Sequence, residues 1–330
     1  MSINNYQYKG NGESGKKLPE YNALFNKSDP ADYIADPALC EAVNVALALG
    51  QPLVLTGEPG TGKTQLAASI AHEYGLPLLE FHTKTTSLAG DMLYQYDAIR
   101  RFQDSQLPGK NVDIKHYITY QPLGIAILLT KPASQVDKIL PEEYQGFGPT
   151  RSVILIDEID KAPRDLPNDV LMEIERMQFK VIETGEIHKA DKKYHPIVIL
   201  TSNSERNLPD AFLRRCVFYH ISFPGDTELK NIVKKRFANM EISPDFSDEF
   251  IKAAITHFTK IRKLGLRKKP ATAEFLAWIT ILKSLDIDIT KLTKEVEKSY
   301  TVLAKSHDDL KRLKKFLKDN VGDEEEIIEL

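Results

Sequence analysis

The chain has 330 residues, 42% hydrophobic and 28% charged, a composition typical of a soluble globular protein long enough for two domains. Its formal net charge of −3 provides no overall basic field that would attract nucleic acid or acidic lipid. Two cysteines, Cys40 and Cys216, are too few for a disulfide framework and favour a reducing, cytoplasmic location. The apolar runs are much shorter than the ~20 residues of a membrane helix, so we expect no membrane span.

The elements expected along the chain alternate between helix and strand. Residues 1–30 are polar, lack the apolar core of a signal peptide and predict a flexible arm. The next segment predicts a helix over 37–49, capped by Asp36. A strand over 52–56 and a helix over 64–74 flank a glycine-rich loop. Further apolar runs predict buried strands at 78–82, 153–156, 197–201 and 217–221.

This alternation indicates an α/β fold with a doubly wound, parallel, five-stranded sheet. After Phe223-Pro224-Gly225 the pattern becomes helical and rich in lysine, which marks a domain boundary. We therefore expect an α/β domain over 31–224 and a helical lid domain over 225–330. Proline, glycine and polar residues in 131–150 predict a long surface loop before the strand at 153.

The glycine-rich loop satisfies the pattern G-x-x-x-x-G-K-[ST] between a strand and a helix, which is the context of a phosphate-binding P-loop. Its glycines allow the backbone to wrap a phosphate, and the N–H groups at the start of the helix point toward it. Lys63 would reach the β and γ phosphates of ATP, and Thr64 would ligate Mg²⁺. The predicted nucleotide-binding residues of the loop are Gly57, Glu58, Pro59, Gly60, Thr61, Gly62, Lys63 and Thr64.

The strand at 153–156 leads into the adjacent carboxylates Asp157 and Glu158, as in a Walker B motif. We expect Asp157 to hold Mg²⁺ through its water shell and Glu158 to orient and deprotonate the attacking water. The strand at 197–201 leads to Asn203, which would position that water beside the γ-phosphate. Asn203 would otherwise be an ordinary turn residue after a strand.

A short helix over 208–216 ends in the pair Arg214 and Arg215. An arginine at a subunit edge can neutralise charge that develops on the γ-phosphate of a neighbouring subunit. A solvated or ion-paired arginine pair is the alternative interpretation. The residues alone do not decide between the two.

Together these motifs resemble the AAA+ superfamily and, within it, the MoxR family, over roughly residues 33–317. The segments 91–102 and 117–124 look like the insert that this family carries in helix 2, here placed at about 88–120. Residues 178–182 and 187–188 flank Glu183-Thr184-Gly185-Glu186 like the hairpin that precedes sensor 1 in the family. The resemblance implies that both are remodelling elements and that the insert faces a ring pore. Residues 303–310 also resemble the family, without a chemical role that we can name.

The resemblance also implies roles for individual residues. Asn203 takes the sensor 1 position, and Arg215 takes the arginine-finger position, with Arg214 as the alternate. Lys269 or Arg267 would serve as sensor 2, although the sequence departs from the commoner pattern of an arginine directly after the proline. A solvated basic run at a helix start explains this segment equally well. His72, His82 and His188 lack metal-ligand spacing, so we expect no transition-metal site.

The expected function is therefore a MoxR-type ATPase that uses ATP and Mg²⁺, works as a hexameric ring, and remodels, matures or activates a protein. Its partner would be a protein client, such as one with a von Willebrand factor A domain. A nucleic-acid motor or restriction-type subunit is the first alternative, allowed by Arg100, Arg101, Lys110 and Lys115 in the insert. A nucleotide-dependent scaffold that barely hydrolyses ATP is the second, and Glu158 and Asn203 argue against it.

Overall fold

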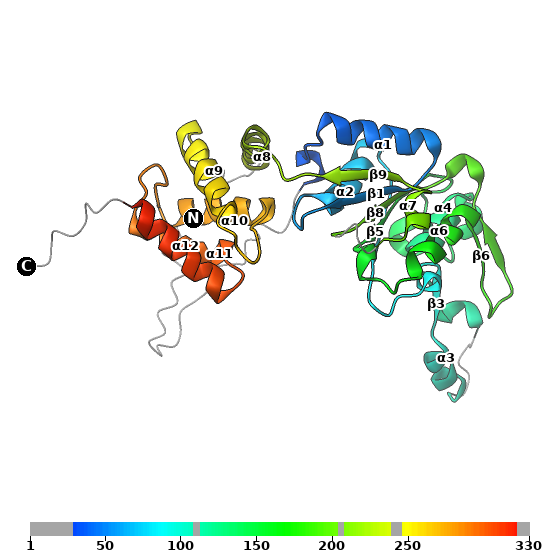
Figure 1. Ribbon diagram of the computed structural model, residues 1–330. Coiled ribbons are helices and arrows are strands. Elements are labelled where there is room, and N and C mark those ends of the chain that lie inside the picture. The colour runs from blue at the N-terminus through cyan, green and yellow to red at the C-terminus, as the bar shows by residue number, and fades with distance from the viewer. Residues whose placement is uncertain (1–28, 108–112, 204–207, 239–245, 322–330) are drawn as a thin grey trace, which may run out of the picture. The chain divides into compact units, whose positions relative to one another are not determined.

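The computed structural model describes residues 29–107, 113–203, 208–238 and 246–321 (Figure 1). The chain divides into two compact units. The α/β unit comprises residues 35–58 and 62–221, and the helical unit comprises the remainder. The predicted arm falls almost wholly outside the described residues, as does Lys110 of the insert. None of the described helices is long and apolar enough to cross a membrane.

The α/β unit is built on a parallel five-stranded sheet in the order β2-β5-β8-β1-β9, as predicted. Strand β1 lies between β8 and β9, so the chain crosses over from β1 to β2 at the far side of the sheet and later returns to pair β9 with β1. Its strands are β1 (Leu53–Gly57), β2 (Leu78–His82), β5 (Val153–Asp157), β8 (Ile197–Thr201) and β9 (Val217–Ile221). Its helices are α1 (Pro37–Leu49), α2 (Lys63–Tyr74), α3 (Ala98–Ser105), α4 (Pro122–Leu129), α5 (Ala133–Val136), α6 (Leu166–Arg176) and α7 (Asp210–Leu213).

Both faces of the sheet are buried, which explains why its central strands read as continuous apolar runs. Val54, Ile154 and Ile156 point to one face and form a core cluster with helices α4 and α6. The alternate residues of the same strands, such as Leu55 and Leu155, are also fully buried, and α2 contacts β1, β2, β5 and β8. The polar residues of the site are therefore confined to the ends of the strands.

Two small β-ribbons extend from the α/β unit (Figure 1). The first lies in the predicted insert and pairs β3 (Tyr94–Tyr96) with β4 (Ile118–Tyr120), with α3 between them. The second is the predicted hairpin, in which β6 (Gln178–Lys180) pairs with β7 (Ile187–Lys189). The hairpin therefore occurs where the alternating pattern predicts one.

An aromatic cluster joins the two ribbons. The Phe179 ring stacks on Tyr94 with a centroid distance of 6.1 Å and meets the edge of Tyr120 at 6.2 Å. His188 lies 5.1 Å from Phe179 and 5.7 Å from Tyr120 between ring centroids. The Tyr94 hydroxyl accepts a hydrogen bond of 3.0 Å from the Ile182 N–H. The insert and the hairpin thus share one packed core.

The segment 131–150, predicted as a long surface loop, is mostly at the surface but contains two short helical elements and two buried side chains. The segment contains helix α5 and a 3₁₀ turn over Glu142–Tyr144. Val136 and Leu140 are 2% and 5% exposed and belong to the main core cluster. Two apolar residues in a segment rich in proline and polar residues are too few to give a periodic pattern, so the sequence did not predict their burial.

The helical unit has its own core. Its helices are α8 (Asp226–Ala238), α9 (Asp248–Arg262), α10 (Thr272–Ser284), α11 (Tyr300–Leu303) and α12 (His307–Asn320). Phe258, Phe275 and Trp278 form the centre of that core and are fully buried. Large aromatic side chains bury much apolar area each, which stabilises a small helical unit.

A buried carboxylate organises the segment before α10. Asp309 is inaccessible to solvent and accepts the N–H of Arg267 at 2.8 Å and that of Lys268 at 3.3 Å. Ser306 caps α12 by accepting the Asp309 N–H at 3.2 Å. The motif at 303–310, which had no chemical role in the sequence, therefore holds the backbone next to the predicted sensor 2 residues.

Candidate functional site

The predicted P-loop connects β1 to α2. Strand β1 is buried along its whole length and ends at Gly57, and α2 begins at Lys63. Gly60 and Gly62 have φ angles of +75° and +90°, which residues with a side chain rarely adopt. These glycines therefore allow the chain to turn tightly into the helix, so that its first N–H groups open toward a ligand.

Lys63 is held inside the loop. It is 7% exposed, and its Nζ donates hydrogen bonds of 2.9 Å to the carbonyl oxygens of Gly57 and Glu58. Burial lowers the pKa of Lys63, and the nearby carboxylates Asp160, Asp157 and Glu158 oppose that shift. The loop thus presents a buried ammonium group close to three acidic side chains.

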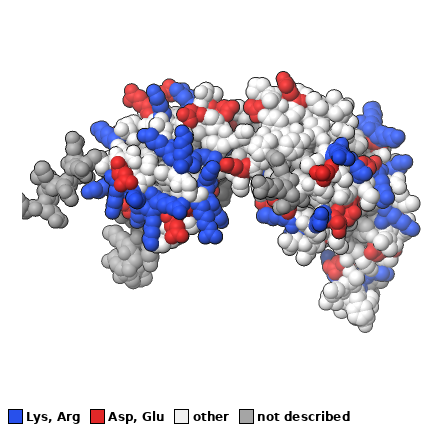
Figure 2. Space-filling model, viewed as in Figure 1, with Lys and Arg blue, Asp and Glu red and all other residues white. Residues whose placement is uncertain are grey.

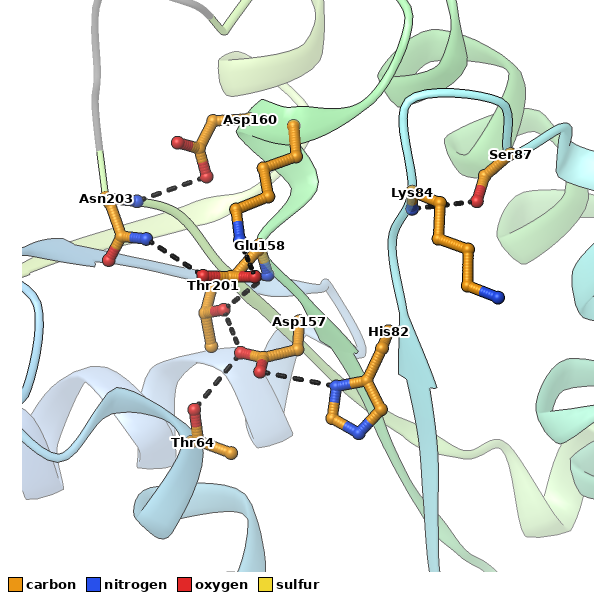
Figure 3. A network of polar contacts seen from close by, with 10 residues as sticks. Thr64, His82, Lys84, Ser87, Asp157, Glu158, Asp160, Thr201 and Asn203 are labelled. Atoms are coloured by element: carbon orange, nitrogen blue, oxygen red, sulfur yellow. Dashed lines mark hydrogen bonds and ion pairs between the residues drawn. The ribbon is translucent and has the colours of Figure 1, made fainter.

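Asp157 lies at the carboxyl end of β5 and receives two hydroxyl groups from neighbouring elements (Figure 3). Thr64 Oγ1, in the first turn of α2, donates to Asp157 Oδ1 at 3.1 Å. Thr201 Oγ1, at the end of β8, donates to the same oxygen at 2.5 Å. The fold therefore brings both predicted magnesium ligands, Thr64 and Asp157, to one point.

Glu158 is fixed by its backbone and by its carboxylate (Figure 3). Its φ is +55°, in the left-handed region, and its N–H donates to Thr201 Oγ1 at 2.9 Å. Asn203 Nδ2 donates to Glu158 Oε1 at 3.4 Å, and Lys161 forms an ion pair with Oε2. A non-glycine residue in this conformation is uncommon and clusters at functional sites.

Asn203 is also anchored through its backbone. Its N–H donates to Asp160 Oδ1 at 3.2 Å, which ties the end of β8 to the turn after β5. The predicted sensor and the predicted base therefore contact each other directly. Residues 204–207, which follow, lie outside the described chain.

His82, at the end of β2, joins the same group. Its Nδ1 lies 3.5 Å from Asp157 Oδ2, and its Nε2 lies 3.8 Å from Glu80 Oε2. The side chain is 67% exposed. The sequence pattern predicted no role for His82, although its position at a strand end beside β5 follows from the sheet order.

The paired arginines lie at the other edge of the sheet. Val217 pairs with Leu53, so Arg215 is level with residue 51, six residues before Gly57. At about 3.3 Å of rise per residue, Arg215 lies about 20 Å from the carboxyl end of β1, beyond the reach of an arginine side chain. Arg214 and Arg215 line a cleft of about 290 Å³ together with Gly50, Pro52, Glu175 and His195.

The predicted sensor 2 residues belong to the helical unit. Arg267 and Lys269 are exposed there, just before α10 begins at Thr272. The rest of the predicted set, apart from the two arginines, gathers at the carboxyl ends of β1, β5 and β8 and around the P-loop.

These residues suit ATP with a magnesium ion. A hydroxyl and a carboxylate oxygen, 3.1 Å apart, are the hard oxygen donors that Mg²⁺ prefers. Lys63 and the N-terminus of α2 would supply the positive charge that phosphates need, and Glu158 and Asn203 would supply a carboxylate base and an amide. When bound, Mg²⁺ would neutralise charge that develops on the β and γ phosphates.

Three contributors to this site were not predicted. Thr201 was recognised only as part of a strand end, while Lys161 and His82 were given no role. The signal that could have found Thr201 and His82 is sheet order, because the carboxyl ends of adjacent parallel strands meet at one edge. Lys161 follows Glu158 by three residues, a spacing that brings side chains together in a helical turn.

The chain is similar to solved structures of one bacterial protein. Among solved structures, a single-site mutant of Thermotoga maritima RuvB is similar, with 19% identity, a TM-score of 0.48, and coverage of 85% of this chain and 73% of that one. The Thermotoga maritima RuvB Holliday junction branch migration motor has 18% identity, a TM-score of 0.45, and coverage of 80% and 67%. No curated protein sequence matches.

Residues 53–224 match the ATPase family associated with various cellular activities (AAA). The matched region begins with β1 and contains the P-loop, the Asp157 and Glu158 pair, Asn203 and both arginines. It spans more than half of the chain. The chain therefore belongs to the AAA family of ATPases and is an ATP-hydrolysing enzyme.

Proposed function

We propose that this ATPase is of the MoxR type and works in the cytoplasm as a hexameric ring that remodels, matures or activates a protein partner. Thr64 and Asp157 would hold Mg²⁺, and the loop Gly57 to Thr64 would hold ATP. A partner with a von Willebrand factor A domain fits the family resemblance. The main support for the ring is the position of Arg214 and Arg215, far from the P-loop of their own subunit.

The contacts around Glu158 support its role as the base. Asn203 Nδ2 lies 3.4 Å from one carboxylate oxygen, so one water that contacts both side chains would be oriented by the amide and deprotonated by the carboxylate. Lys63 would contact the β and γ phosphates, exchanging its present carbonyl partners for phosphate oxygens. The chain itself thus supplies the base, the amide and the ammonium group.

No arginine at the end of α7 can reach the phosphates of its own subunit, because the sheet separates them by about 20 Å. An arginine can stabilise the transition state when it is supplied by a neighbouring subunit. A closed ring brings the same edge of each subunit to the nucleotide site of the next subunit, so every site in the ring receives an arginine. We therefore assign Arg215 as the finger and keep Arg214 as the alternate.

The surface of the two ribbons favours a protein client over nucleic acid. Ile99 and Phe102 on α3 are 73% and 68% exposed, and Ile182 and Ile187 on the hairpin are 80% and 65% exposed. Figure 2 shows a mostly uncharged surface over the end of the insert that carries α3. Nucleic-acid sites present basic side chains to phosphates, whereas exposed apolar groups are typical of protein-binding surfaces.

The ring mechanism predicts how turnover depends on assembly. ATP hydrolysis per subunit should rise with protein concentration as the mass measured by light scattering increases. Glu158→Gln and Arg215→Ala should each lower the rate of the assembled protein by about 100-fold or more. A rate independent of concentration in a persistent monomer, unchanged by Arg215→Ala, would exclude the ring mechanism.

The class of client is tested by measuring ATP turnover in the presence of a polypeptide or of DNA. An unfolded, reduced polypeptide should stimulate turnover, and double-stranded DNA should not. Ile99→Ser combined with Phe102→Ser should abolish the stimulation and leave basal turnover unchanged. Salt-sensitive stimulation by DNA alone would instead identify a nucleic-acid motor.

A further inference from the structure

We propose that Glu175 is the positioning residue for the arginine finger and that it selects Arg215, rather than Arg214, for this role. The inference rests on the proposed ring mechanism and adds a residue that the family motifs did not single out. It starts from one ion pair in the cleft at the amino-terminal edge of the sheet.

Glu175 lies in the last turn of α6, and helix α7 packs against α6. Its Oε1 lies 3.8 Å from Arg215 Nε. Both side chains are about half exposed, at 57% for Glu175 and 49% for Arg215. Within the described residues, the ion pair of Glu175 is with Arg215 and not with the adjacent Arg214. The two arginines are thus distinguished by their partner although they line the same cleft.

The atoms involved suit a finger. Glu175 holds Arg215 through Nε, so the two terminal nitrogens of the guanidinium group are not the atoms in this contact. Those nitrogens are the ones that reach farthest and can bind two phosphate oxygens side by side. The Glu175 carboxylate beside Nε therefore restricts the aliphatic part of the Arg215 side chain, while the two terminal nitrogens can still bind an anion.

Restricting the stem matters because an arginine has many rotamers, and only a few of them suit a phosphate on another subunit. A group held near its productive geometry loses less freedom in the transition state. An ion pair between two half-exposed residues contributes little to folding stability. Glu175 should consequently affect the rate of hydrolysis much more than the stability of the protein.

The test compares Glu175→Gln with Glu173→Gln, a matched control on the same helix. Glu173 also pairs with an arginine at 3.8 Å, but its partner is Arg176 of α6. The full chain is assayed at concentrations where wild type is assembled, with mass followed by light scattering. Glu175→Gln should lower kcat by about 10-fold, with KM for ATP and the assembled mass unchanged. Glu173→Gln should leave kcat unchanged, and Glu175→Asp should restore part of the loss.

A double mutant separates this inference from the ring mechanism. If Glu175 acts through Arg215, then Glu175→Gln should have no further effect in an Arg215→Ala background. The role of Glu175 would be overturned, with the finger left in place, if Glu175→Gln lowered kcat equally in the wild-type and Arg215→Ala backgrounds. It would also be overturned if Glu175→Gln left the wild-type kcat unchanged while Arg215→Ala was severely impaired. Loss of assembly by Glu175→Gln would also overturn it. A wild-type rate for Arg215→Ala would instead reject the finger itself.

Discussion

The hydroxyl of Thr201 donates a 2.5 Å hydrogen bond to Asp157, across the boundary between strands β8 and β5. The same oxygen accepts the N–H of Glu158 at 2.9 Å. One buried hydroxyl therefore fixes the proposed magnesium ligand and the backbone of the proposed base together. Thr201 is 1% exposed, so water does not replace the hydroxyl readily.

Thr201→Val should lower kcat by about 10- to 100-fold, because Asp157 and Glu158 each lose a partner that orients them. Stability should fall by about 1–3 kcal/mol, from the Glu158 N–H left without its acceptor. Steady-state kinetics and urea unfolding measure the two effects. Thr56→Val is the control, since this buried hydroxyl lies 3.0 Å from His220 Nδ1. Equal kinetic losses in both variants would contradict the prediction.

Lys161→Met should raise the basal rate of hydrolysis by about 2- to 5-fold. The ammonium group pairs with Glu158 Oε2, and this ion pair must be broken before that oxygen can accept a proton from the attacking water. The rate at saturating ATP, measured in wild type and variant at one protein concentration, tests this effect. Lys298→Met removes a similar ion pair, with Glu295 three residues earlier at 2.8 Å, and should change nothing. A fall in the Lys161→Met rate would show that the lysine assists the base.

The helical unit should lose stability as the pH falls from 6.5 toward 4. Burial, with a smaller contribution from Lys260, lowers the pKa of His257 from 6.5 to about 4. The unfolded chain therefore binds a proton in this range that the folded chain does not, and unfolding becomes easier by up to about 3 kcal/mol. His257→Gln, which retains a polar group near the Tyr300 hydroxyl, should be less stable at pH 7 and should vary less with pH. Parallel stability curves for both proteins would contradict this assignment.

Asp309→Ala should destabilise the helical unit by about 2–4 kcal/mol in urea unfolding. The substitution removes the acceptor of two N–H groups, those of Arg267 and Lys268, at a position closed to solvent. Asp308→Ala, at an exposed position in the same turn, should cost less than 1 kcal/mol. Equal losses for the two variants would exclude a specific role for the buried carboxylate.

The sequence predicted the sheet and the phosphate loop because both depend on local patterns. Buried parallel strands read as apolar runs, and the loop needs glycine at positions such as Gly60 and Gly62. The contacts of Thr201 and His82 with Asp157 depend instead on which strands are neighbours, which no local pattern specifies. The same limit applies to 131–150, where the two buried side chains that hold the segment could not be recognised from its polar composition.

The aromatic cluster of Tyr94, Tyr120, Phe179 and His188 couples the insert to the hairpin mechanically. Packed interiors are hardly compressible, so a displacement of one ribbon is passed to the other rather than absorbed between them. The hairpin lies in the chain between the Glu158 turn and the strand that leads to Asn203. We therefore expect the two ribbons, with their exposed apolar side chains, to move together when either of them is displaced.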